Sequence, residues 1–279
     1  MNFKKTILTL IAFTAILVSC SSQKEKLKKL DQSLTRDFVA MIEADPDVRF
    51  DSLAPLFKKR LKTELTKPGT FKYPFDSLSK KLSVVTTDDG KFRTFSWDEQ
   101  GGGRWNIIAV FGQYKTERGR VAVQVLSSID EMEEGGYTDS YIFETHTLNI
   151  DGKTHYLTLG SGTLGSNFIQ RMVQIFKIEG DSLVSCGSCF EENWTAGGRY
   201  DYLAVEARRW DNIDLKFNPE TNEITFNEYV DPGTTHPGEP PVNAVTLKLV
   251  DGVFRTISSV KLSDEEAKNL REKSRHRLW

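Results

Sequence analysis

The sequence predicts a mainly β protein with N-terminal helices, an α+β chain whose larger part is one antiparallel meander. Up to residue 82, apolar residues recur every three or four positions, as they do along helices that bury one face. From residue 83 the apolar period changes to two, and short turns rich in Gly, Asp and Asn separate the runs. The chain also holds 17 Phe, 8 Tyr and 5 Trp residues, which favour the pleated surface of a sheet.

Length and charge narrow the class of protein. A chain of 279 residues suffices for one large domain, or for one domain with a smaller appendage. Its formal net charge is −2, so there is no basic excess of the kind that binds DNA or RNA. We therefore expect no nucleic-acid partner.

Residues 1–19 have the features of an export signal. Lys4 and Lys5 form a basic start, and the stretch Thr6–Val18 contains no charge. This stretch is too short to span a membrane comfortably. It ends in Leu17-Val18-Ser19-Cys20, which resembles the lipobox of bacterial lipoprotein precursors. The alternative is an ordinary signal peptide in which Cys20 is incidental.

The lipobox resemblance implies cleavage before Cys20 and lipidation of that residue. In lipoproteins of this class the cysteine thiol receives a diacylglycerol and its amine is then acylated, and two or more acyl chains hold a protein stably on a membrane. Ser21 follows the cysteine, where lipoproteins retained at the inner membrane often have Asp, so the resemblance points to the outer membrane. The mature chain would start at Cys20 and have a formal charge of about −4, because Lys4 and Lys5 are removed.

Residues 20–26 are expected to form a polar tether, and residues 27–82 a helical segment. One amphipathic helix is predicted from Leu27 to the Asp45-Pro46 stop. A second is predicted from Asp51 to the Lys67-Pro68-Gly69 stop, and a short third one over 76–82. These helices either form a separate cap or stalk, or cover one end of the sheet.

Residues 83–262 are predicted to form an antiparallel β domain, followed by a helix over 263–279. Asp89-Gly90 lies between two alternating runs and predicts the first hairpin. A sheet with so many strands must curl, split or close, so barrel, sandwich and small propeller all remain open. Ser263 and Glu266 have the spacing of a capping box at the start of the last helix. The further strands are expected at 106–115, 121–127, 140–150, 153–159, 168–178, 183–186, 202–208, 214–217, 224–229, 244–250 and 253–258.

Two phrases recur in the chain. The stretch GGRWNIIAV at 102–110 is echoed by GGRYDYLAV at 197–205, and DGKFRTFS at 89–96 is echoed by DGVFRTIS at 251–258. The first pair predicts a Gly-rich turn that leads into a strand.

These two turns are candidate ligand loops, because a guanidinium beside an aromatic ring suits a carboxylate, a phosphate or a sugar ring. The alternative is a reused hairpin in which the arginine stacks on its aromatic neighbour. The candidate ligand-binding residues are Trp97, Arg104, Trp105, Trp194, Arg199 and Tyr200.

Cys186 and Cys189 are the cysteines that remain if Cys20 is lipidated. An exported chain is oxidised readily, so a disulfide between them is favoured, with a reduced pair as the alternative. The chain has only four His residues and no second cysteine pair, so we expect no metal site.

Catalytic signatures are mostly missing from the sequence. GSGTLG at 160–165 fits a dinucleotide loop by its letters, but a strand is predicted after it rather than a helix, so a wide turn is expected and no cofactor. A glycosidase needs only two carboxylates at a set separation. The acidic residues beside the Gly-rich phrases are Asp98, Glu99, Glu191 and Glu192.

The function that the sequence favours is a lipid-anchored envelope protein, a non-catalytic binding or assembly module for a glycan or protein partner. The alternatives are a carbohydrate-active hydrolase and a purely structural lipoprotein. Binding predicts exposed Trp97, Trp105 or Trp194 around a groove, hydrolysis predicts two facing carboxylates, and a structural role predicts buried aromatic rings.

Overall fold

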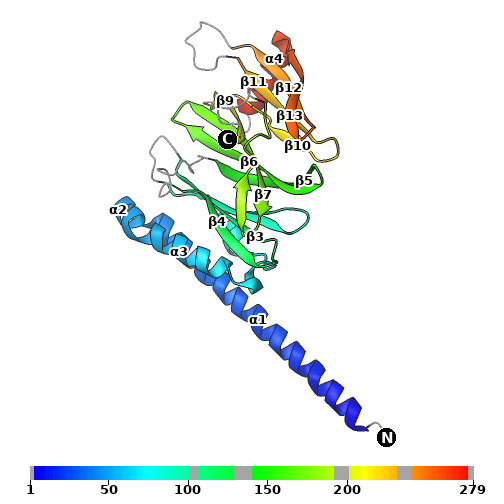
Figure 1. The fold of residues 1–279 in the computed structure, drawn as a ribbon. Helices are drawn as coiled ribbons and strands as arrows, with labels where there is room; N and C mark the ends of the chain where they lie inside the picture. The colour runs from blue at the N-terminus through cyan, green and yellow to red at the C-terminus, as the bar shows by residue number, and fades with distance from the viewer. Residues whose placement is uncertain (1–2, 101–105, 129–139, 192–200, 231–239, 276–279) are drawn as a thin grey trace. The chain divides into compact units, whose positions relative to one another are not determined.

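The computed structural model describes residues 3–100, 106–128, 140–191, 201–230 and 240–275. The chain divides into two compact units, Met1–Leu82 and Ser83–Trp279, here called the helical unit and the β unit. Figure 1 follows the chain from α1 through the strands to α4. The prediction of a mainly β chain with N-terminal helices is confirmed.

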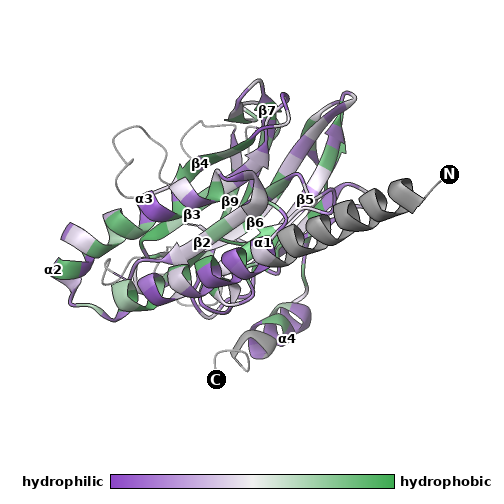
Figure 2. Cartoon of the chain, turned by 90° about the horizontal axis from the view of Figure 1, so that it is seen from below, coloured by the Kyte–Doolittle hydropathy of each residue, from purple (hydrophilic) through white to green (hydrophobic). Residues whose placement is uncertain are grey.

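The helical unit contains one long helix and several short ones. Its elements are α1 (Phe3–Glu43), α2 (Pro46–Val48), the π-helical turn η1 (Arg49–Leu53), α3 (Ala54–Leu65) and the 3-10 turns η2 (Pro68–Thr70) and η3 (Leu78–Lys80). Apolar side chains three or four residues apart meet between α1 and α3, where the rings of Phe38 and Phe57 lie 5.5 Å apart. Helix α3 and the coloured C-terminal part of α1 show apolar residues beside polar ones (Figure 2).

Two buried charged residues fix the ends of these helices. The Arg49 guanidinium donates hydrogen bonds to the carbonyl oxygens of Met41, Ile42 and Ala44, at the C-terminal end of α1 where the helical hydrogen bonds stop. The Asp31 carboxylate accepts the backbone N–H groups of Ser77 and Leu78 at 2.9 and 3.0 Å, so it caps η3 from the side of α1.

The expected tether over 20–26 is helical in the structure, because α1 continues through it. The stretch contains no Gly or Pro, and Lys and Glu favour a helix. Lys29 and Glu25 lie one turn apart with their charged groups at 4.0 Å, which adds a small stabilisation.

The strands of the β unit form three sheets rather than one meander. Sheet A has the order β1-β2-β3-β4, sheet C the order β10-β11-β12-β13, and sheet B the order β5-β6-β7-β8 with β9 also paired to β7. Every ladder between named strands is antiparallel, as predicted. Among the described strands no sheet closes into a barrel.

The strand bounds follow the sequence periodicity closely. Those of sheet A are β1 (Ser83–Thr86), β2 (Phe92–Asp98), β3 (Ile108–Lys115) and β4 (Val121–Ser127). Those of sheet B are β5 (Tyr141–Ile150), β6 (Lys153–Leu164), β7 (Phe168–Glu179), β8 (Ser182–Ser185) and β9 (Tyr202–Arg208). Those of sheet C are β10 (Lys216–Asn218), β11 (Glu223–Tyr229), β12 (Val242–Val250) and β13 (Val253–Lys261).

Two hairpins end in the same two-residue Asp-Gly turn. Asp151 and Gly152 join β5 to β6, and Asp251 and Gly252 join β12 to β13. All four residues have positive φ angles between 50° and 79°, a conformation that Asp tolerates and Gly adopts readily. These turns set the strand register, pairing Ile150 with Lys153 in the first hairpin.

Sheet B shares apolar cores with both other sheets. Neighbouring residues of β6 point to opposite faces, so Tyr156 packs with Phe92 of sheet A, while Leu157 lies in a core with residues of sheet C. The rings of Phe92 and Tyr156 are 5.2 Å apart. Ile142 of β5 adds a third contact, in a small cluster with Ile108 and Val110 of sheet A.

The last helix, α4 (Asp264–Arg275), begins with the predicted capping box. The Glu266 carboxylate accepts from the Ser263 backbone N–H at 2.9 Å, and the Glu266 N–H donates to the Ser263 hydroxyl at 3.3 Å. Ala267 joins the core of sheets B and C. Arg271 is buried, with its Nε 3.7 Å from a carboxylate oxygen of Asp211, and lies over the ring of Tyr229.

Candidate functional site

Most of the predicted ligand loop lies outside the described residues. This applies to Arg104, Trp105, Trp194, Arg199 and Tyr200. The strands that follow the two Gly-Gly-Arg phrases are described, and they belong to different sheets, β3 in the middle of sheet A and β9 beside β7 in sheet B.

Trp97 is not exposed, and the prediction that it offers an open aromatic surface is wrong. It lies on β2, whose residues from Phe92 to Trp97 are all buried. The side chain is 1% exposed, and its ring stacks on Phe111 with centroids 5.4 Å apart and planes at 20°. The physical reason is that β2 pairs on both sides, so a large aromatic ring on this strand packs in the core.

GSGTLG at 160–165 is a strand and its end rather than the expected wide turn. Gly160, Ser161 and Gly162 lie within β6 and pair with β7. A Cβ added at Gly160 would lie 2.4 Å from the Ser140 hydroxyl oxygen, so the glycine allows a close approach of two chain segments. Close packing of these two segments therefore accounts for a glycine at position 160.

The described acidic residues near the Gly-rich phrases hold backbone in place. Asp98 accepts the N–H groups of Gln100 and Ile107 at 2.8 and 3.3 Å. Glu191 accepts the N–H of Thr256 at 3.0 Å. Glu99 is fully buried, and Glu192 lies outside the described residues. Asp98 and Glu191 therefore act as acceptors for backbone N–H groups.

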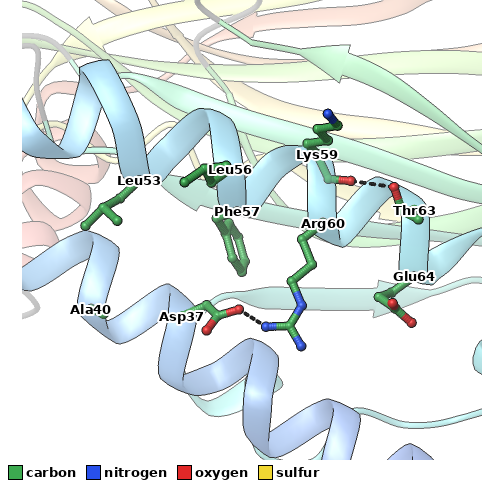
Figure 3. Close-up of a pocket in the computed structure, with 9 residues that line it drawn as sticks. All are labelled: Asp37, Ala40, Leu53, Leu56, Phe57, Lys59, Arg60, Thr63 and Glu64. Atoms are coloured by element: carbon green, nitrogen blue, oxygen red, sulfur yellow. Dashed lines mark hydrogen bonds and ion pairs between the residues drawn. The ribbon is translucent and has the colours of Figure 1, made fainter.

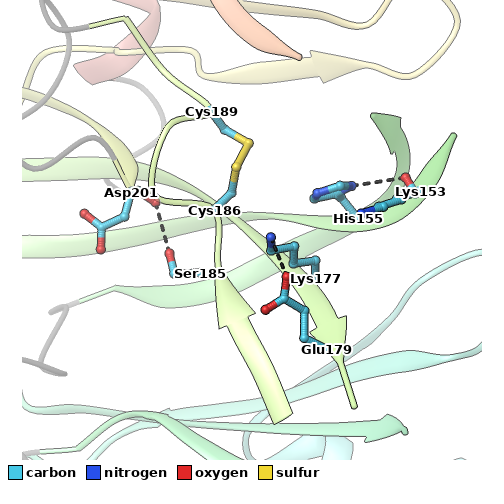
Figure 4. Close-up of a disulfide and its surroundings, with 8 residues drawn as sticks. All are labelled: Lys153, His155, Lys177, Glu179, Ser185, Cys186, Cys189 and Asp201. Atoms are coloured by element: carbon cyan, nitrogen blue, oxygen red, sulfur yellow. Dashed lines mark hydrogen bonds and ion pairs between the residues drawn. A yellow bond between two sulfur atoms is a disulfide. The ribbon is translucent and has the colours of Figure 1, made fainter. Parts of the chain in front are cut away.

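The predicted disulfide between Cys186 and Cys189 is present (Figure 4). It closes a turn that leaves sheet B after β8 and reaches sheet C. The Cys186 N–H donates to the Ile175 carbonyl at 2.8 Å, and the Phe254 N–H donates to the Cys189 carbonyl at 2.8 Å. Phe190 then forms a parallel bridge with Phe254, and their rings stack. The disulfide thus links the two sheets that share the larger core.

The charged cavity of the β unit lies where strands of sheets A and B end together. It has a volume of about 570 Å³ and is called the basic pocket below. β2 starts and β3 finishes at one end of sheet A, and β6 starts and β7 finishes at one end of sheet B. Because Phe92 packs against Tyr156, these two ends are brought together. The lining residues are Lys91, Lys115, Thr116, Glu117, Gly119, Lys153, Thr154, Tyr156, Lys177, Ile178 and Glu179.

The lining of the basic pocket contains four lysines and two glutamates, a net charge of +2. Lys177 forms an ion pair with Glu179 at 2.6 Å, which lowers the pKa of that carboxyl through the hydrogen bond and the charge of Lys177 (Figure 4). Lys91 and Lys115 are held side by side, since the Lys115 N–H donates to the Lys91 carbonyl at 3.1 Å. The pocket therefore has an excess of positive charge.

Tyr156 forms the inner wall of this pocket in its neutral form. Burial raises its pKa to about 12, and the charge of the nearby Asp89, together with a hydrogen bond to it, adds to the shift. Asp89 is itself held in the β1–β2 turn, where it accepts the Lys91 N–H at 2.9 Å. The phenol is thus a fixed wall group rather than an acid or base for catalysis near neutral pH.

Two loops close the rim of the basic pocket. The Glu117 N–H donates to the Gly180 carbonyl at 3.1 Å, and the Tyr114 hydroxyl donates to the Asp181 carbonyl at 2.9 Å. The Asp181 carboxylate binds Arg120, and Arg118 lies 3.7 Å from it. These contacts tie the β3–β4 turn of sheet A to the β7–β8 turn of sheet B.

The helical unit has a groove of its own between α1 and α3, with a volume of about 560 Å³ (Figure 3). Its lining combines apolar side chains with charged ones, and the ion pair of Asp37 and Arg60 crosses it from one helix to the other. Leu56 lies on its rim and is well exposed. Nothing in this groove distinguishes one ligand chemistry from another.

Over the described part of the chain, no group of three or more His, Cys, Asp and Glu side chains is placed to hold a metal ion. Within that same part, no helix is both long and apolar enough to cross a membrane. No protein-family model matches the sequence, and no curated protein matches it.

Proposed function

We propose that this chain is a lipid-anchored envelope protein that acts as a non-catalytic binding or assembly module for a glycan or a protein partner. The lipobox at Leu17-Val18-Ser19-Cys20 supports the anchor and the outer membrane as its site. The disulfide between Cys186 and Cys189 agrees with an exported chain, because such bonds persist in oxidising compartments. The basic pocket is the observation that supports binding, and it favours an acidic partner.

A hydrolase receives less support from the geometry. Asp98 and Glu191 accept backbone N–H groups, which accounts for these two carboxylates by a structural role. The buried ring of Trp97 favours a purely structural role for its part of sheet A. It does not bear on the basic pocket, which lies at the opposite end of β2. We also infer a sandwich-like β unit rather than a barrel or propeller, because sheet B shares a core with each of the other two sheets.

The anchor is tested by replacing the proposed acceptor of lipid. In the wild type we expect an N-terminal peptide that starts at acylated Cys20 in mass spectra, and a protein that stays with membranes after a high-salt wash. Cys20→Ser is expected to keep its signal segment and to lack the acyl mass. Cys186→Ser/Cys189→Ser serves as the control, because it also replaces cysteine with serine, leaves no new free thiol and keeps the lipobox intact. An uncleaved wild-type chain with a free Cys20 thiol contradicts the proposed anchor.

The binding role is tested with the full chain in a neutral detergent and two envelope probes, isolated peptidoglycan sacculi and purified surface polysaccharide. We expect cosedimentation with at least one probe, weakened by salt and by Lys91→Gln/Lys115→Gln. Lys216→Gln/Lys261→Gln removes the same charge from exposed positions of sheet C and should leave binding unchanged. Equal loss in both variants would assign the effect to overall charge and contradict a role for the pocket.

A further inference from the structure

We propose that the basic pocket is a binding site for a phosphate group carried by a larger molecule, either a sugar or a lipid headgroup. This inference rests on the proposed binding function and names the chemistry of its ligand. It concerns the end of the β unit formed by the β3–β4 turn and the ends of β2, β3, β6 and β7.

The pocket presents several cations to one ligand. Its lining has four lysines and two glutamates, of which Lys177 and Glu179 form an ion pair, and Asp89 adds a negative charge beside Tyr156. A phosphate monoester has a charge of roughly −1.5 to −2 near neutral pH and three acceptor oxygens, so it can contact more than one lysine at a time. The backbones of Lys91 and Lys115 are adjacent, since the Lys115 N–H donates to the Lys91 carbonyl.

The type of cation is compatible with phosphate, which lysine binds as a point charge. Arg118 and Arg120 of the β3–β4 turn are engaged by Asp181. The cations that line the pocket are all lysines, whose flexible stems can follow a tetrahedral group.

Hydroxyl groups supply further donors in the pocket wall. The Thr116 hydroxyl oxygen accepts the Arg120 N–H at 3.2 Å, which leaves its own proton for another acceptor. Thr154 is exposed on the opposite side, at the start of β6. The volume of about 570 Å³ exceeds what a phosphate alone fills, so the rest of the ligand has room beside Ile178 and Tyr156.

The first experiment titrates the full chain, in neutral detergent at constant ionic strength, with inorganic phosphate, acetate and chloride. Calorimetry should show saturable binding of phosphate and none of acetate or chloride. Lys91→Gln/Lys115→Gln should weaken phosphate binding about tenfold or more, which corresponds to the loss of one charge-assisted hydrogen bond. Lys216→Gln/Lys261→Gln, with the same change of net charge, should bind like the wild type.

The second experiment distinguishes the two sources of phosphate. Glucose 6-phosphate is the sugar probe, and mixed micelles with phosphatidic acid are the lipid probe. Tighter binding of either probe than of inorganic phosphate, lost in the Lys91/Lys115 variant, supports the site and assigns its source.

Binding of phosphate no stronger than that of acetate overturns the inference, as does equal weakening in the Lys216/Lys261 control. One outcome is that acetate binds as tightly as phosphate, while sacculi or polysaccharide are still captured through Lys91 and Lys115. In that case the phosphate site is refuted and the proposed binding function stands. If the envelope probes are not captured but phosphate binds through these lysines, the proposed glycan or protein partner is refuted and the phosphate site stands.

Discussion

Adding one methyl group at Gly160 should reveal how tightly sheet B is packed. Gly160 lies in β6, between Ile142 of β5 and Met172 of β7. The Cβ of Gly160→Ala would lie 2.4 Å from the Ser140 hydroxyl oxygen, 3.1 Å from the Ser140 Cβ and 3.2 Å from the Ile142 Cδ1. The hydroxyl must move by close to 1 Å for ordinary contact, and overpacking of this kind costs about 1–3 kcal/mol.

The same substitution has an opposing effect through the unfolded chain. Gly160 has no positive φ angle, so alanine can adopt its backbone conformation, and Gly→Ala at such a position stabilises by about 0.4–1 kcal/mol. The steric cost exceeds this gain. We therefore expect Gly160→Ala to lower the free energy of unfolding by about 1–2 kcal/mol.

Ser140→Ala provides the test of the cause. Ser140 is 0% exposed, and its hydroxyl has no hydrogen-bond partner among the described residues. Removing that hydroxyl should be neutral or slightly stabilising. In the Ser140→Ala background the remaining contacts of the new Cβ are 3.1 and 3.2 Å, so Gly160→Ala should then cost clearly less than in the wild type. The two changes should couple by about 1 kcal/mol or more.

Urea unfolding followed by tryptophan fluorescence is the assay, because all five Trp residues belong to the β unit. Gly187→Ala is the control, since a Cβ there meets nothing within 4 Å, and it should change stability by less than about 1 kcal/mol. The reasoning is refuted if Gly160→Ala is as stable as the wild type, or if it is equally destabilised with and without the Ser140 hydroxyl.

Three further outcomes are expected of the β unit. In urea unfolding, Cys186→Ala/Cys189→Ala should lower the free energy of unfolding by on the order of 2 kcal/mol, because the disulfide no longer removes the entropy of a four-residue loop from the unfolded chain. A reducing agent should lower the stability of the wild type but not that of this variant. Burial raises the pKa of Tyr229 to about 12 from 10.0, so its neutral form stabilises the fold below pH 10 and this contribution is lost as the pH rises toward 12. Between pH 10 and 12 the urea midpoint should therefore fall less steeply with pH in Tyr229→Phe than in the wild type. Equal slopes in the two proteins would contradict a raised pKa of Tyr229. Arg271→Gln should destabilise by about 3–5 kcal/mol because it leaves a buried carboxylate without its cation, whereas the exposed Lys268→Gln on the same helix should stay within about 0.5 kcal/mol of the wild type in thermal unfolding.

The positions of the strands were predictable because local patterns determine them. Val121–Ser127 and Tyr202–Arg208 have the predicted bounds, and the Asp-Gly turns mark the hairpins. β6 extends five residues beyond its predicted end at Leu159, since the glycines that suggested a turn are tolerated inside a strand where another segment passes close by. The division of the antiparallel strands into three sheets was less predictable, because strand order beyond the hairpins depends on side-chain packing far apart in the sequence, as in the pairing of β9 with β7.

The candidate site was less predictable than the strands. Trp97 was chosen for its aromatic ring beside glycines, but an alternating pattern does not tell which face of a central strand is covered. The other lysines of the basic pocket are 24 to 86 residues from Lys91, without a motif, and only the packing of sheet A against sheet B brings their strand ends together. A usable signal was present, because Lys91, Lys115, Lys153 and Lys177 each lie at or near a predicted strand end.

The division of the β unit into three sheets has a consequence for the order of folding. The strands of sheet A come from residues 83–127, those of sheet B from 141–208 and those of sheet C from 216–261, so no sheet borrows a strand from another part of the chain. Contacts between near neighbours in sequence form faster than distant ones, because less loop entropy is lost. As the chain emerges N-terminus first from a ribosome or a translocation pore, each sheet can complete its hydrogen bonds before the next one appears. The core that sheet B shares with sheet C is then completed last, because it includes residues as far along the chain as Ala267.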